Sequence, residues 1–237
     1  MKRKKKNFKI ISLGFLTILM LIFISTRLAY ANKEDKMKNL MAGLNQINYQ
    51  TSLLKEERAL VFNKLKKDLD EFKNKKSAEI NQSNSFYLLK ETEFSADELE
   101  SAIEDTPLRG LGKDFKKAEE TYGVNAILLM AMAKHETGNG TSQLFLNKNN
   151  LFGFNAYDDD PYNKASNYES PADSINTVAK HLKENYLNPK GTYYKGVSTE
   201  AIGKSYATDP DWAKKVNWMM TEVAETMINK FEESTSN

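Results

Sequence analysis

The chain has 237 residues, of which 40% are hydrophobic and none is cysteine. It is therefore long enough to bury a core, while a disulfide scaffold, a thiolate zinc site and a cysteine nucleophile are excluded. Seven of the 34 basic residues precede Asn32 with no acidic residue among them, which leaves 27 basic and 32 acidic residues in the rest, a net charge of −5. A mildly acidic body argues against a nucleic-acid partner.

Residues 1–31 have the three parts of an export signal. A basic cluster at residues 1–7 is followed by an apolar run over residues 10–24 and by the small-x-small pattern Ala-Tyr-Ala at residues 29–31. The run is short for a full membrane span. We expect a signal peptide cleaved after Ala31, with a retained signal anchor as the alternative. In both cases the segment engages the membrane at least during export, and the body is extracytoplasmic, either secreted or anchored to the outer face of the cytoplasmic membrane.

Residues 32–85 differ in composition from the rest and are rich in Lys, Glu, Leu, Asn and Gln. Apolar residues recur there at a spacing of three or four, which predicts two amphipathic helices broken near residues 49–52. These residues are Leu40, Leu44, Ile47, Val61, Leu65, Leu69 and Phe72. The polar stretch 76–85 is typical of a linker. We expect a helical stalk or accessory region whose apolar faces pack, and a protein partner for the helices of residues 33–85 is left open.

Residues 86–232 predict one mostly helical domain. Helix signals are a capping box at Ser95, a stop at Gly123, and a cap at Ser170 followed by Pro171. Helices are expected over residues 96–104, 113–122, 126–137, 141–145, 171–186, 199–204 and 210–231. Turn formers and aromatics over residues 157–167 predict a small β-hairpin lobe. The expected fold is therefore α+β, a mostly helical lysozyme-like domain with a small β-hairpin lobe, preceded by an N-terminal helical region and followed by a disordered tail at residues 233–237.

Glu136 lies at the end of one of these helices. Gly138 follows it and stops the helix, while Leu129 and Met132 share its helix face. The carboxyl is therefore expected to face an apolar cleft. Desolvation and the negative end of the helix dipole both disfavour its ionised form, so its pKa is expected to rise. A carboxyl that stays protonated suits a general acid, and the alternative is a solvated glutamate in a fraying last turn.

Five segments stand in an order that resembles a known family. They are AKHETGNGTS at 133–142, NLFGF at 150–154, AYDDDPYN at 156–163, YESPADSI at 168–175 and SYATDPDWAKKV at 205–216. Together they resemble the bacterial peptidoglycan N-acetylglucosaminidases of glycoside hydrolase family 73, the autolysin glucosaminidases. The resemblance covers a little under half of the chain and does not extend to residues 33–85. Each segment alone is a weak signal, whereas the ordered set is specific.

The resemblance implies hydrolysis of the β-1,4 bond after N-acetylglucosamine in the glycan strands of peptidoglycan, and therefore a place of action at the cell wall. It implies that Glu136 is the general acid and that Tyr206 lies beside the reacting sugar as a further catalytic residue. It also implies that the segment 150–153 lines the cleft. We accordingly expect Asn150, Phe152 and Gly153 to bind substrate.

The sequence does not identify a single residue as the second catalytic group beside Glu136. A glycosidase commonly uses two carboxyl groups, and members of the family place the second on a glutamate in a threonine-rich strand that this sequence lacks. The available acids are Asp158, Asp159, Asp160 and Glu169. We rank Asp158 first and Asp160 second, and expect Tyr157 and Asp160 to contact substrate. The alternatives are a solvated acidic turn and attack by the acetamido group of the substrate without a second carboxylate.

Neither a metal site nor a cofactor is predicted. His135 and His181 do not form the His-Glu-x-x-His pattern of a zinc hydrolase. The acidic run at residues 158–160 lacks the spaced oxygen ligands and the closing glutamate of a calcium loop.

Two other functions stay open on the sequence. A lysozyme-like scaffold also supports lytic transglycosylases, which cleave after muramic acid with a single glutamate and leave an anhydro product. The other alternative is a non-catalytic, wall-associated scaffolding protein in which residues 33–85 are the working part.

Overall fold

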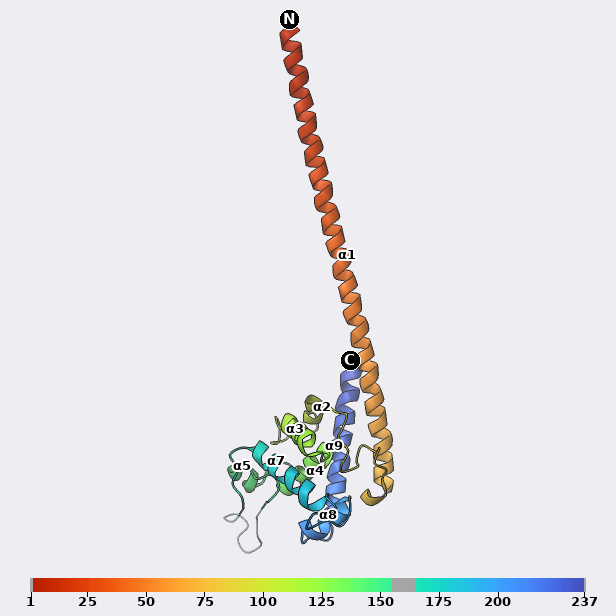
Figure 1. The fold of residues 1–237 in the computed structure, drawn as a ribbon, viewed down its shortest axis with the longest axis vertical. Coiled ribbons are helices and arrows are strands. Elements are labelled where there is room, and N and C mark those ends of the chain that lie inside the picture. Colours follow the sequence, from red (N-terminus) through yellow and green to blue (C-terminus); the bar gives the residue numbers. More distant parts are fainter. Residues whose placement is uncertain (1, 155–164, 237) are drawn as a thin grey trace. The chain divides into compact units, whose positions relative to one another are not determined.

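The computed structural model describes residues 2–154 and 165–236. The chain divides into two units, Met1–Arg58 and Ala59–Asn237. The elements are α1 (Lys2–Asn74), η1 (Ser77–Glu79), α2 (Ala96–Glu100), α3 (Gly112–Tyr122), α4 (Ala126–Thr137), α5 (Gln143–Lys148), α7 (Pro171–His181), η2 (Leu182–Tyr186), α8 (Thr199–Tyr206) and α9 (Trp212–Thr235). The mostly helical class is thus confirmed (Figure 1). The described residues hold no β-strand, and the hairpin predicted for residues 157–167 falls largely on residues 155–164, which lie outside them.

Helix α1 runs without interruption from Lys2 to Asn74, so the predicted break near residues 49–52 is wrong. The hydroxyls of Thr51 and Ser52 donate to the carbonyls of Ile47 and Tyr49 over 2.9 and 2.8 Å. Polar side chains that bond back onto the preceding turn are compatible with a continuing helix, and no glycine or proline interrupts this stretch.

The first unit, Met1–Arg58, contains only the first part of α1. Its apolar residues Leu40, Leu44 and Ile47 are exposed. The packing face that the spacing predicted there therefore finds no partner within this unit. In the described part of the chain, no helix is both long enough and apolar enough to cross a membrane.

The second unit begins inside α1, ahead of the boundary predicted at residue 86. Phe62 and Phe72, at the end of α1, are buried. The Phe62 ring stacks on Phe231 of α9 with 4.1 Å between centroids, and the Phe72 ring stacks on Phe86 with 4.4 Å. The last turns of α1 are therefore part of the core that α9 completes.

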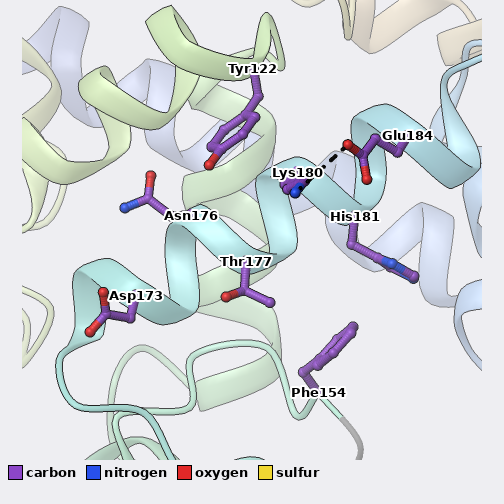
Figure 2. A pocket seen from close by; sticks show the side chains of 8 residues that line it. All are labelled: Tyr122, Phe154, Asp173, Asn176, Thr177, Lys180, His181 and Glu184. Carbon is purple, nitrogen blue, oxygen red and sulfur yellow. Dashed lines mark ion pairs between the residues drawn. The ribbon is translucent and has the colours of Figure 1, made fainter.

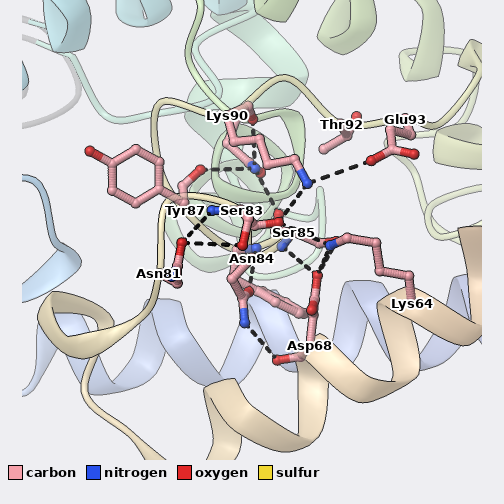
Figure 3. A network of polar contacts seen from close by, with 12 residues as sticks. Lys64, Asp68, Asn81, Ser83, Asn84, Ser85, Tyr87, Lys90, Thr92 and Glu93 are labelled. Atoms are coloured by element: carbon pink, nitrogen blue, oxygen red, sulfur yellow. Dashed lines mark hydrogen bonds and ion pairs between the residues drawn. The ribbon is translucent and has the colours of Figure 1, made fainter.

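A polar network fixes the predicted linker to this unit (Figure 3). Asp68 pairs with Lys64 and accepts hydrogen bonds from the backbone N–H and the hydroxyl of Ser85, both over 2.7 Å. Burial alone would raise the pKa of Asp68, but the hydrogen bonds from Lys64 and Ser85 outweigh it and lower the pKa. Lys90 donates to the carbonyl of Ser83 over 2.7 Å. Residues 83–85 are consequently ordered parts of the domain.

Asn125 joins the same segment to the start of α4. Its buried side chain caps α4, since Oδ1 accepts from the N–H groups of Ile127 and Leu128 over 2.9 and 3.3 Å. Its Nδ2 donates to three backbone carbonyls, those of Ser85, Tyr87 and Lys90, over 2.9, 3.2 and 3.0 Å. One amide thus satisfies two helix donors and three loop acceptors.

We expect Asn125→Ala to lower the free energy of unfolding by about 2–4 kcal/mol, because it removes a helix cap and leaves buried carbonyls without a donor. Asn125→Ser keeps a capping oxygen and should cost less. Urea unfolding followed by circular dichroism measures both variants. Equal losses in the two variants would mean that the cap contributes nothing.

Helix α4 is apolar on all sides, which is the pattern of a helix enclosed by others. It packs against α9 and α3, and α9 lies beside it (Figure 1). The predicted signals at Ser95, Gly123 and Ser170 are confirmed, with Gly123 in the left-handed conformation at φ 62°. Helix α2 ends at Glu100, earlier than predicted. Helix α9 continues to Thr235, into the segment predicted to be a disordered tail.

Candidate active site

Glu136 occupies the last turn of α4, at the position that the sequence predicts. The helix ends at Thr137 because Gly138 takes the left-handed conformation with φ 56°. The Glu136 side chain is partly buried, and this burial raises the pKa of its carboxyl. The hydrogen bond from Trp212 and the charge of His135 act in the opposite direction without cancelling the rise. The expected direction of the pKa shift is therefore confirmed.

Trp212 holds the Glu136 carboxyl from the first position of α9. Its indole Nε1–H donates to Glu136 Oε1 over 2.8 Å. The indole is buried and fixed by its surroundings, since a Cβ atom at Gly203 of α8 would lie only 3.1 Å from the ring. The Trp212 backbone N–H also donates to the carbonyl of Asp209 over 3.1 Å. One oxygen of Glu136 thus has a rigid donor.

The cleft in front of Glu136 has a volume of about 620 Å³. An aromatic series contributes to its lining. The ring centroids of Phe154 and His181 are 5.2 Å apart, those of Tyr186 and Tyr206 5.8 Å, and those of Tyr206 and Trp212 5.0 Å. Tyr186 ends the π-helical turn η2, a local distortion that is common at functional sites. Aromatic faces of this kind suit the apolar faces of sugar rings.

Tyr206 lies in the same cleft as Glu136. Burial, together with the negative charge of Glu136, raises the pKa of the Tyr206 phenol well above its ordinary value. The phenol therefore stays protonated at neutral pH. Its hydroxyl donates to the carbonyl of Phe152 over 3.5 Å, which ties the end of α8 to the loop 150–154.

The loop 150–154 carries the residues Asn150, Phe152 and Gly153, which the sequence predicts to bind substrate, but only two of them line the cleft. Phe152 and Gly153 line the cleft, and Gly153 has φ 60°, a conformation suited to glycine. Asn150 is buried behind them. Its Nδ2 donates to the carbonyls of Phe154 and Ser166 over 3.1 and 3.0 Å, while its Oδ1 accepts from the Phe154 N–H over 3.0 Å. Its amide shapes the loop.

The predicted second carboxylate cannot be placed. Tyr157, Asp158 and Asp160 lie outside the described residues. Glu169 is exposed and does not line the cleft, and in the described lining the only carboxylate besides Glu136 is that of Asp209. A hydrogen bond from Lys215 over 2.6 Å lowers the pKa of Asp209.

The sequence analysis did not assign several residues that line the cleft, among them His181, Tyr186, Asp209 and Trp212. Two of them, Asp209 and Trp212, stand in the SYATDPDWAKKV segment that carried the resemblance, which was the available signal. No residue pattern marked His181 or Tyr186 as facing Glu136. Within residues 2–154 and 165–236 no cluster of three His, Asp or Glu residues suitable for a metal ion occurs.

A second hollow of about 440 Å³ adjoins the cleft (Figure 2). It shares Phe154 and His181 with the cleft and continues along α7 past Asn176 and Thr177. Burial lowers the pKa of His181, so its imidazole is neutral at pH 7. The lining of the hollow also includes the charged residues Asp173, Lys180 and Glu184, so the hollow offers both charged and neutral polar groups.

Comparisons with known proteins match the region around this cleft. Residues 112–225 match the glucosaminidase family model, which is described as mannosyl-glycoprotein endo-beta-N-acetylglucosaminidase. A "Putative endo-beta-N-acetylglucosaminidase" of Streptococcus pneumoniae is 34% identical over 148 residues, which cover 60% of this chain and 22% of that protein. A bifunctional autolysin of Staphylococcus aureus is 35% identical over 130 residues, which cover 45% of this chain and 10% of that protein. The matched region is thus at most about a fifth of the length of these two relatives.

Solved structures of staphylococcal proteins also resemble this chain, among them those of autolysin E and glucosaminidase B. A crystal structure of S. aureus autolysin E in complex with the muropeptide NAM-L-Ala-D-iGlu has 26% sequence identity and a TM-score of 0.48, and the match covers 58% of this chain and 70% of that chain. A crystal structure of S. aureus glucosaminidase B has 22% identity and a TM-score of 0.47, over 69% of this chain and 72% of that chain.

Proposed function

We propose that the protein hydrolyses the β-1,4 bond after N-acetylglucosamine in the glycan strands of peptidoglycan. The match of residues 112–225 to the glucosaminidase family model supports this proposal. The observation that supports this most strongly is the Glu136 carboxyl, which has a raised pKa and a fixed donor at the wall of an aromatic cleft. The naming of relatives as an endo-β-N-acetylglucosaminidase and an autolysin agrees with the proposal.

In the proposed mechanism Glu136 donates a proton to the glycosidic oxygen as the bond to the sugar breaks. Trp212 holds Oε1, so the proton is carried by Oε2. The neutral Tyr206 phenol would lie beside the sugar, where its oxygen can accept a hydrogen bond from a sugar hydroxyl while its O–H donates to the Phe152 carbonyl. The positive sugar centre that develops needs a second group. We retain Asp158 as the first candidate, with the acetamido group of the substrate as the alternative. Asn150 supports this site through the loop that carries Phe152 and Gly153.

Trp212→Phe is expected to shift the alkaline limb of the pH profile. A general acid must be protonated, so kcat/KM declines as pH rises through the pKa of Glu136. The indole N–H stabilises the ionised carboxylate, and its removal raises the pKa of Glu136 further. We therefore expect the decline to move to higher pH, while loss of orientation lowers kcat by about 10- to 100-fold. A decline at an unchanged or lower pH would contradict the assignment of Trp212.

The place of action belongs to the same proposal. Residues 1–31 would direct export, as a cleaved signal or a retained anchor, and the domain would act on the wall outside the membrane. Mass analysis of the N-terminus of protein isolated from its native host separates the two forms, because cleavage leaves Asn32 as the first residue.

Counting new reducing ends in purified peptidoglycan tests the proposal. Each hydrolytic cut creates one reducing end, so we expect them to rise in step with solubilised glycan when the full chain is added. A lytic transglycosylase would solubilise glycan without new reducing ends. A non-catalytic scaffolding protein would do neither.

A further inference from the structure

Trp218 of α9 is a large apolar side chain that lies exposed on the surface of the second unit, outside the cleft. It is 62% exposed, whereas Trp212, less than two turns earlier on the same helix, is 2% exposed. An exposed indole loses favourable contacts with protein, and tryptophan on a surface commonly serves recognition. Its surroundings show what it could recognise.

Two hollows meet at Trp218. One, of about 340 Å³, is lined by His135, Lys215 and Trp218, and the other, of about 600 Å³, by Trp218, Asn217 and Glu200 among others. Lys214 and Trp218 border both. The indole therefore lies between two depressions.

The first of these hollows neighbours the cleft, because His135 lines both. Asp209 of the cleft and Lys215 of the hollow form an ion pair over 2.6 Å. Along α9, Trp218 lies about 9 Å beyond Trp212 at the helical rise per residue. A polymer held against Glu136 could thus continue over His135 toward Trp218.

The charges around Trp218 are mostly basic. Lys214 lines both hollows and Lys76 lines the second. In the described part of the chain neither forms an ion pair, whereas the neighbouring cations Lys73, Lys75 and Lys215 are paired with Glu225, Glu71 and Asp209. Asp211 lines the first hollow and Glu200 the second, but the lysines of the lining outnumber these two acids, and the excess of positive charge favours an anionic ligand.

We propose that the Trp218 surface, made of Trp218, Lys214 and Lys76, is a distal subsite for the same glycan strand whose scissile bond lies at Glu136. The indole face stacks on a sugar ring, and the two lysines pair with carboxylates of the muramic acid units or their peptides. This inference rests on the proposed function and adds that the enzyme engages its polymer well beyond the cleaved bond.

The test compares long and short substrates with the full chain. Steady-state kinetics are measured on long, peptide-bearing glycan strands and on the disaccharide of N-acetylglucosamine β-1,4-linked to N-acetylmuramic acid, which places only one sugar on each side of the scissile bond and does not reach Trp218. We expect Trp218→Ala to raise KM for long strands about tenfold with kcat unchanged, and to leave the disaccharide unaffected. Lys214→Ala should raise KM only for strands that carry carboxylates. Leu60→Ala, at another exposed apolar residue of the second unit, is the matched control.

An unchanged KM for long strands in Trp218→Ala would overturn the inference, as would an equal rise for the disaccharide. Because Trp218 is exposed, its replacement should not alter thermal unfolding. Turnover of the disaccharide by the wild-type protein tests the proposed function separately, so the two failures are distinguishable.

Discussion

Glu136→Gln is expected to lower the rate of glycan hydrolysis by about 10²- to 10⁴-fold, the usual contribution of a general acid. Glutamine keeps the shape of the side chain and its oxygen can still accept from the Trp212 indole, but it has no proton to donate to the leaving oxygen. Substrate should still bind, so the loss should appear in kcat rather than in KM.

The stability of this variant should not fall. Burial raises the pKa of Glu136, so the contribution of this group is fully present below its unfolded pKa and is lost as pH rises through the folded pKa. At neutral pH a neutral glutamine avoids the cost of burying a charge, and the melting temperature should equal or exceed that of the wild type. Glu120→Gln, an exposed change on α3, is the control and should leave activity intact. Full activity in Glu136→Gln would remove Glu136 from the mechanism.

Removal of residues 1–85 is expected to prevent folding, whereas removal of residues 1–58 is not. The shorter deletion cuts α1 where the second unit begins. The longer one also removes four buried side chains of α1, Phe62, Leu65, Leu69 and Phe72. Each contributes about 1.5–3 kcal/mol, or about 6–12 kcal/mol together, which is comparable to the 5–15 kcal/mol stability of a whole domain.

Circular dichroism and thermal unfolding distinguish the two deletions. Residues 59–237 should melt cooperatively and cleave glycan, while residues 86–237 should show no cooperative transition. The longer deletion also takes away Asp68 and Ser85 and one carbonyl that Asn125 binds. A cooperative melt of residues 86–237 would show that the end of α1 is an accessory, as the sequence boundary at residue 86 implied.

Helix ends were predictable because their signals are local. The capping box of Ser95 with Glu98 and the left-handed Gly123 involve residues within one or two turns of each other. The break predicted near residues 49–52 was wrong because that prediction also rested on local sequence alone. Thr51 and Ser52 lower helix propensity, but hydroxyl bonds to the preceding turn allow α1 to continue.

The candidate site was predictable only in part. Glu136 could be found from its helix and its motif, but the hydrogen bond from Trp212 joins residues that are 76 positions apart. Spacing along one helix cannot indicate such a contact. Asn150 was predicted to bind substrate from its position in the motif. That position does not reveal that its amide forms hydrogen bonds with the loop itself. Burial of the end of α1 likewise depends on α9, far along the chain.

The identity of the residue at each new reducing end tests the proposed function most directly. Purified peptidoglycan is digested with the full chain, reduced with borohydride and analysed by mass spectrometry. We expect the reduced ends to be N-acetylglucosaminitol, formed by the wild type and nearly absent with Glu136→Gln. Ends of N-acetylmuramitol, or 1,6-anhydromuramic acid ends, would contradict cleavage after N-acetylglucosamine by hydrolysis.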